Sequence, residues 1–155
     1  MWPWEHVAIG YLAVSALARG REDRAPTDGE AVAVVAASLA PDLIDKPLAW
    51  EFRVFESGYG LGHSAFFAVP VALAAIGVAR SRGRAGVGAA FGVAYLLHLP
   101  ADLALGYVTA GDLPVARILW PVYSEESTYT EGFSGTLAEY LGEYVHAVLS
   151  GDVGT

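Results

Sequence analysis

Residues 87–102 read VGAAFGVAYLLHLPAD, a stretch in which an apolar run ends at a polar pair. The run is rich in alanine and leucine and carries no charge before its end, which is typical of a helix. His98 and Asp102 are four residues apart, so both side chains would lie on one face of that helix. An imidazole and a carboxylate beside hydrocarbon must be paired or bound to a cation. The stretch therefore predicts a helix whose polar end can hold an ion.

Apolar segments of the same kind recur along the chain. We predict helices at 7–18, 31–43, 64–79 and 87–99, the last able to continue to residue 107, and an amphipathic helix at about 136–149. The chain has no internal repeat, and its 155 residues predict a single domain over 1–155.

The composition restricts the class of protein. A hydrophobic content of 54% with only 17% charged residues is high for a soluble protein of this size, and the mean hydropathy of +0.41 points toward a bilayer. The formal net charge of -8 argues against a nucleic-acid partner, because nothing resembles a basic stripe for phosphates. There is no cysteine, so a metal ion would have to be held by imidazole and carboxylate groups.

Basic and aromatic residues are sorted between the two ends of the predicted bundle. Three arginines follow the first segment and three follow the third, namely Arg19, Arg21, Arg24, Arg80, Arg82 and Arg84. In an up-down bundle these two loops share one end, which the positive-inside rule makes cytoplasmic. The opposite end has fewer basic residues and all four tryptophans, as an interfacial belt requires: Lys46, Arg53 and Arg117, with Trp2, Trp4, Trp50 and Trp120.

The predicted segments are shorter than the about 20 residues that span a hydrocarbon core, so a soluble helical bundle is the alternative. The sorting of charges and tryptophans favours the membrane, because a soluble core predicts no such sorting. We therefore predict an all-α fold: a membrane-embedded bundle of four short helices plus an amphipathic C-terminal helix, in the cell or inner membrane.

Six polar residues fall at the end of the bundle that carries the tryptophans. They begin or end the apolar segments, and they are His6, Asp42, Asp45, His63, His98 and Asp102. This convergence was not used to place the helices, so it supports both the topology and a common site. On the predicted topology the site faces the extracytoplasmic side.

Two imidazoles and two carboxylates without a thiolate suit zinc, with manganese or iron as alternatives. His63, His98 and Asp102 are candidate ligands, together with Asp42 or Asp45. The aspartate that does not bind the ion would take a proton from its water. His6 is a candidate second-metal ligand or acid/base group.

Structural roles for the same residues stay open at this point. His98 and Asp102 could form a hydrogen-bonded pair that stabilises a helix end. His63 could bond to the backbone or to Ser64, and Asp42 after its proline could be a turn residue.

Four motifs occur in the order found in a known family. They read LAPDLID at 39–45, GHS at 62–64, HLPAD at 98–102 and LWP at 119–121. In these motifs the chain resembles the YdjM-like family of membrane-bound, metal-dependent hydrolases, over residues 1 to about 123. The order Asp, His, His-x-x-x-Asp is also similar to one metal site of the zinc-dependent phospholipase C and single-strand nuclease superfamily, an all-helical fold that acts on phosphate esters.

The chain departs from the pattern of its relatives at 58–64, which reads GYGLGHS where many of them carry an additional histidine and arginine. That departure puts a second metal ion, or a cation that binds phosphate, in doubt.

The resemblance implies metal-dependent hydrolysis. The position of the site at the lipid boundary makes a lipid-like phosphoester or another ester of an amphiphilic substrate the expected substrate class, with membrane lipid as the surrounding partner. The candidate catalytic residues are Asp42, Asp45 and His6, and the candidate metal ligands are Asp42, Asp45, His63, His98 and Asp102. The rival hypothesis is a non-enzymatic membrane protein in which a structural metal ion or an ion-pair network holds the helix ends together.

Overall fold

The computed structural model describes residues 1–125 and 131–151, and within these ranges it contains helices and no strand. The elements are α1 (Pro3–Glu22), α2 (Asp28–Trp50), α3 (Ala65–Ser81), α4 (Ala85–Ala110), the short 3-10 helix η1 (Val115–Ile118) and α5 (Phe133–Ser150). The predicted all-α fold is confirmed, with all five predicted helices in order.

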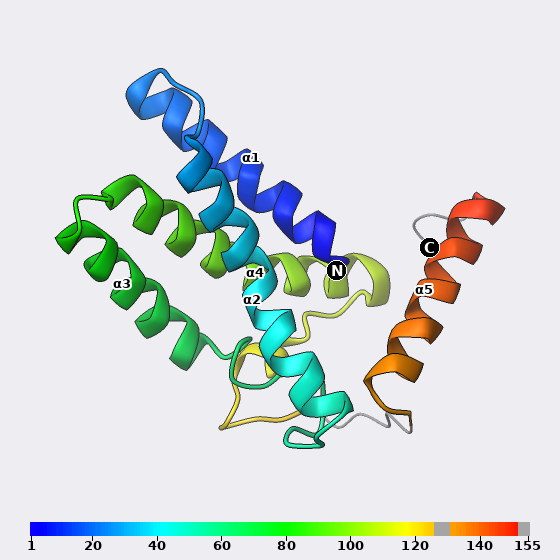
Figure 1. Ribbon diagram of the computed structural model, residues 1–155. Coiled ribbons are helices and arrows are strands. Elements are labelled where there is room, and N and C mark those ends of the chain that lie inside the picture. The colour runs from blue at the N-terminus through cyan, green and yellow to red at the C-terminus, as the bar shows by residue number, and fades with distance from the viewer. Residues whose placement is uncertain (126–130, 152–155) are drawn as a thin grey trace.

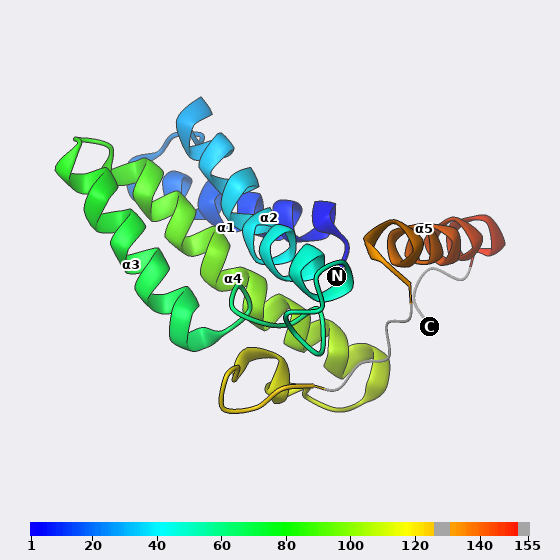
Figure 2. The ribbon, with the colours of Figure 1, turned by 60° about the horizontal axis from the view of Figure 1, so that its bottom comes forward.

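Helix α4 is the centre of the bundle. Helices α1, α2 and α3 all pack against it, and α1 also packs against α2 (Figures 1 and 2). The α1–α2 and α3–α4 connections lie at one end of the bundle (Figure 1). The chain start, the long α2–α3 connection and the second half of α4 therefore meet at the other end, where the six polar residues were predicted to gather.

The helices are longer than predicted, because the predicted segments were limited to the most apolar residues. Helix α2 passes through Pro41 and Pro47, and α4 passes through Pro100. The acidic and histidine residues of these two helices thus lie inside them, and the expectation that they end the helices is wrong. The start of α2 is fixed by a capping box, in which the Thr27 hydroxyl accepts a hydrogen bond from the backbone N–H of Glu30.

The interior of the bundle is made of small side chains, and larger apolar ones point outward. Its buried core consists largely of alanines: Ala33, Ala37, Ala68, Ala90 and Ala94. Large apolar side chains are exposed on the outer faces of several helices, among them Leu12, Val32, Phe66 and Leu73. Close packing through small residues, with apolar side chains outside, is what helices surrounded by lipid require. Among the described residues one helix, α4, has the length and apolar composition to cross a membrane.

Helix α5 lies beside the bundle and is attached to it by aromatic contacts (Figure 2). Trp2 and Trp4 stack on each other, and both contact Tyr144 of α5. Trp50 lies against Phe133 and Tyr140 of α5 and is only 5% exposed. Three of the four tryptophans expected in an interfacial belt therefore hold α5 against the polar end of the bundle.

We expect Gly88→Ala to destabilise the protein by about 1–3 kcal/mol, the usual cost of overpacking a tight interface. A Cβ at Gly88 would lie 2.7 Å from the Cβ of Ala79 and 3.0 Å from the Cα of Ile76, so α3 and α4 would have to separate. The measurement is thermal unfolding in detergent. Gly77→Ala is the matched control, since a Cβ there meets nothing within 4 Å, and equal melting temperatures for the two variants would contradict the prediction.

Candidate metal centre

The structure brings together all six polar residues singled out in the sequence. They come from α1, α2, the α2–α3 connection and α4, and each is buried, with exposed fractions between 0% and 7%: His6, Asp42, Asp45, His63, His98 and Asp102. Burial of so many ionisable groups requires that they be paired or neutralised by a cation.

Asp45 fixes the loop that carries His63. Its carboxylate accepts hydrogen bonds from the backbone N–H groups of Gly60, Gly62 and His63 at 2.8, 2.8 and 2.9 Å. It also accepts one from Nδ1 of His63 at 2.8 Å. Gly62 allows this close approach, because a Cβ there would lie 2.8 Å from the Cα of Pro41 in α2. The loop is thus held against α2 with the His63 ring in one orientation.

The partners of the two central histidines determine which ring nitrogen carries a proton. The Nδ1 atom of His63 faces the Asp45 carboxylate, and Nδ1 of His98 lies 2.8 Å from the carbonyl oxygen of Ser38. Both oxygens only accept, so both Nδ1 atoms must donate, and the neutral rings carry their lone pairs on Nε2. These two Nε2 atoms lie 3.1 Å apart. Two lone pairs facing each other at this distance repel unless a proton or a metal ion lies between them.

The electrostatics of the loop favour a positive charge at the same point. Burial lowers the pKa of His63, but hydrogen bonds with Asp102, Asp42 and Asp45 outweigh it and raise the pKa to about 10. Without a metal ion, a proton on Nε2 of His63 supplies this charge. A divalent ion between the rings would replace that proton.

The two nearest carboxylates complete a donor set of the right size for an ion. Asp42 Oδ1 lies 3.5 Å from Nε2 of His63 and 3.9 Å from Nε2 of His98. Asp102 Oδ2 lies 3.5 and 3.7 Å from the same two atoms. Ligand atoms about 2.1 Å from a common zinc ion are about 3.0–3.4 Å apart, so small side-chain shifts bring the set into range. The other oxygen of Asp42, Oδ2, is buried without a hydrogen-bond partner among the described residues.

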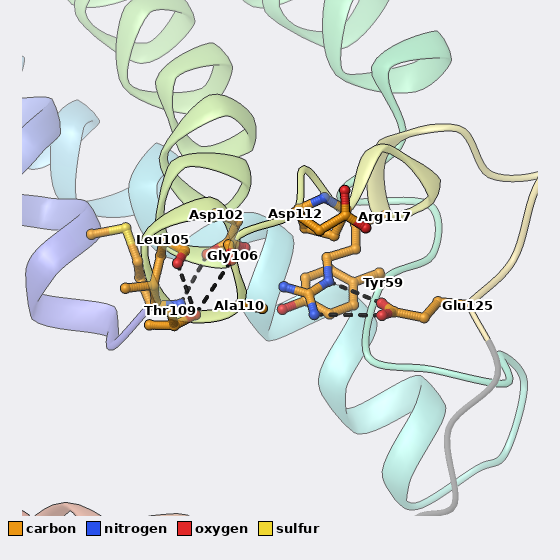
Figure 3. Close-up of a pocket in the computed structure, with 11 residues that line it drawn as sticks. Tyr59, Asp102, Leu105, Gly106, Thr109, Ala110, Asp112, Arg117 and Glu125 are labelled. Atoms are coloured by element: carbon orange, nitrogen blue, oxygen red, sulfur yellow. Dashed lines mark hydrogen bonds and ion pairs between the residues drawn. The ribbon is translucent and has the colours of Figure 1, made fainter. Parts of the chain in front are cut away.

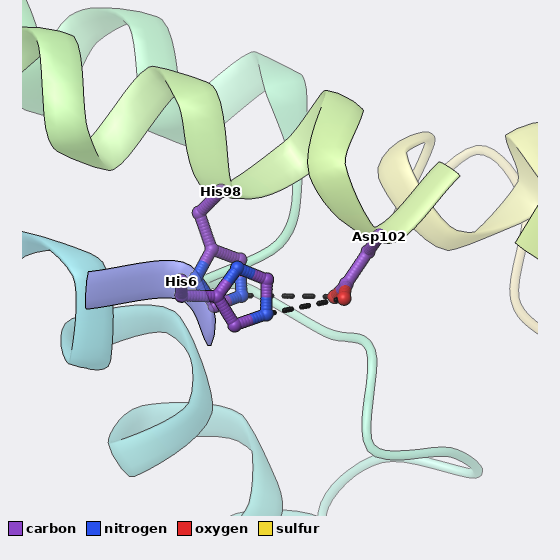
Figure 4. Close-up of side chains that lie close together, drawn as sticks. All are labelled: His6, His98 and Asp102. Carbon is purple, nitrogen blue, oxygen red and sulfur yellow. Dashed lines mark ion pairs between the residues drawn. The ribbon is translucent and has the colours of Figure 1, made fainter. Parts of the chain in front are cut away.

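His6 belongs to the same cluster in a different way. Its ring stacks on that of His98 with centroids 3.6 Å apart and planes 13° from parallel, and its Nε2 is 3.2 Å from Oδ1 of Asp102 (Figure 4). Within the part of the chain that the structure describes, two groups of three could hold an ion: Asp42, His63 and His98, or His6, His98 and Asp102. Both need Nε2 of His98, because its Nδ1 is bonded to Ser38. The two groups are therefore alternatives. The group with His63 is the better one, because the rings of His6 and His98 are stacked nearly parallel and their in-plane lone pairs do not converge on a common point.

A comparison with known protein families shows the family of this chain. The family model described as YdjM inner membrane protein matches residues 1–145. The chain belongs to the YdjM inner membrane protein family. The match includes most of α5, so it extends beyond the part that carries the four motifs. The YdjM family name makes this a membrane protein, in keeping with its composition and with helix α4. No curated protein and no solved structure matches the chain.

Several groups around the centre were missed in the sequence. Lys46 lies 2.8 Å from Oδ1 of Asp42, and the N-terminal ammonium of Met1 lies 2.9 Å from Oδ1 of Asp102. The four-residue spacing of Asp42 and Lys46 was a usable signal, because such residues share a helical face. The Ser38 carbonyl that orients His98 gave none, since backbone groups have no signature in a sequence.

Proposed function

We propose that this membrane protein is a metal-dependent hydrolase, acting on a phosphoester or another ester of an amphiphilic substrate. The ion, zinc in the first place and manganese or iron as alternatives, would be held by Asp42, His63, His98 and Asp102. The observation that carries the proposal is the pair of facing Nε2 atoms 3.1 Å apart between two buried carboxylates. When bound, such an ion lowers the pKa of a water molecule toward about 7 and polarises a phosphoryl or carbonyl oxygen.

The remaining polar groups position ligands and move protons. Asp45 orients His63, because its oxygens already accept four hydrogen bonds, which leaves Asp42 as the better ligand of the two aspartates. His6 is then the better acid/base group, since its Nδ1 has no hydrogen-bond partner among the described residues and its Nε2 faces Asp102.

The surroundings favour an enzyme over a purely structural ion site. A cavity of about 310 Å³ is lined in part by Asp102, so a substrate could approach the centre from that side. Six arginines lie in the last turns of α1 and α3 and in the two short connections that follow them, at the opposite end of the bundle, which supports an extracytoplasmic position for the centre. Exposed apolar helix faces around the bundle would place lipid-like substrates near the cavity.

The test is hydrolysis by the full-length protein in maltoside detergent, with bis(p-nitrophenyl) phosphate and p-nitrophenyl butyrate as substrates. We expect chelation to abolish turnover and zinc, manganese or iron to restore it. Asp42→Asn should lower both the metal content and the rate by about 100-fold or more, since it removes a ligand rather than an outer partner. Asp28→Asn, at the other end of α2, should change neither.

Turnover that survives complete chelation would contradict the proposal. Stoichiometric metal binding without hydrolysis of either ester class would support the structural role instead.

A further inference from the structure

The cavity beside the metal centre contains one basic side chain. It lies between the second half of α4, the segment from 112 to 125 and the α2–α3 connection (Figure 3). Of the described residues that line it, Arg117 is the only lysine or arginine; the N-terminal ammonium of Met1, which also lines it, is paired with Asp102. Asp102 also lines the cavity, and its carboxylate faces His63 and His98. A molecule in this cavity would therefore touch both the guanidinium and the edge of the metal centre.

The guanidinium of Arg117 is held in place. It lies 4.7 Å over the ring of Tyr59, and its Nε and Nη2 atoms donate to Glu125 at 2.9 and 3.4 Å. Its remaining terminal nitrogen, Nη1, has no hydrogen-bond partner among the described residues and faces Gly106 of α4, where a Cβ would be 3.5 Å away. An arginine stacked in this way loses little entropy when it binds a planar or tetrahedral anion.

We infer that Arg117 binds an anionic group of the substrate, of the phosphate class, in the cavity next to Asp102. The inference rests on the proposed function and adds to it the charge of the substrate. Glu125 now occupies the guanidinium fork and presents the same two-oxygen geometry that a phosphate would offer. Its side chain is 34% exposed, so it can leave the fork when another anion enters.

The acidic residues around the cavity differ in how strongly they would repel such an anion. Asp102 faces the histidines and the Met1 ammonium, and Glu125 is paired with Arg117 itself. Asp112, at the end of α4, is exposed to solvent, where its charge is screened.

The experiment measures binding of inorganic phosphate to the zinc-loaded, full-length protein in maltoside detergent by calorimetry. We expect Arg117→Gln to weaken binding by about 10-fold or more, because it removes a charged donor pair. The phosphate affinity of Arg117→Lys should lie between those of the wild type and Arg117→Gln, since lysine keeps the positive charge but lacks the two-donor guanidinium group. Glu125→Gln is the matched control: it breaks the same ion pair but keeps the guanidinium, and should bind phosphate as tightly as the wild type or more tightly.

Three results would overturn the inference. In the first, the wild type binds no phosphate. In the second, Arg117→Gln binds phosphate as tightly as the wild type, because only the metal ion holds it. In the third, Arg117→Gln and Glu125→Gln lose phosphate binding equally, because breaking the ion pair has moved the loop. These outcomes do not depend on turnover. Metal-dependent hydrolysis of p-nitrophenyl butyrate without phosphate binding would support the proposed function and contradict the phosphate site at Arg117. Phosphate binding through Arg117 without any hydrolysis would support the phosphate site and contradict the proposed function.

Discussion

Replacing His98 with alanine is expected to abolish binding of the divalent ion. Among the described residues, Nε2 of His98 belongs to both groups of three that could hold an ion, so neither of these groups is complete without it. Loss of an outer partner typically costs 10–100-fold in affinity, and we expect loss of this ligand to cost more than about 100-fold. The measurement is the metal content of purified protein after dialysis against buffered zinc.

His146→Ala is the matched control, because His146 is an exposed histidine of α5 outside the cluster. Insertion of the His98→Ala protein into the membrane and its helical content should be unchanged, since the helices of the bundle are held by apolar contacts beyond this residue. A folded His98→Ala protein that retains its full metal content would place the ion elsewhere.

Much of the fold could be predicted from the sequence because its signals are local. Alanine-rich apolar runs predicted the five helices in order, and an up-down order of these helices placed the two short connections at one end of the bundle. The helix ends could not be predicted in the same way. Pro41, Pro47 and Pro100 lie inside helices, where packing against neighbouring helices overrides the local preference that proline expresses.

The location of the candidate site could be predicted from the sequence, but the roles of its residues could not. Assigning six polar residues to the same end of the bundle was enough to predict that they lie together, although those of α2 and α4 lie inside their helices. Their separate roles depend on partners that are far away in the chain or belong to the backbone, such as the Ser38 carbonyl at Nδ1 of His98. Arg117 and Tyr59 are another example, because only the path of the chain after α4 brings the guanidinium over that ring.

Asp45→Asn is expected to weaken metal binding by about 10–100-fold, as loss of an outer partner does, and in addition to destabilise the protein without metal. The carboxylate accepts four hydrogen bonds, three from backbone N–H groups and one from the ring of His63. An amide has one oxygen, and its NH2 group would face donors. Each buried donor left unpaired costs about 1–3 kcal/mol, so a loss of several kcal/mol is expected. Zinc titration and thermal unfolding of the metal-free protein measure the two effects.

Asp42→Asn is the comparison that separates the roles of the two aspartates. The backbone hydrogen bonds that hold the loop at 60–63 go to Asp45, and Asp42 Oδ2 has no hydrogen-bond partner among the described residues, so Asp42→Asn should lower metal affinity more than metal-free stability. Asp45→Asn should lower metal-free stability more than metal affinity. If Asp45→Asn instead kept its full metal-free stability and lost the ion entirely, Asp45 would be a ligand, and the hydrogen bonds that orient His63 would have to rearrange when the metal binds.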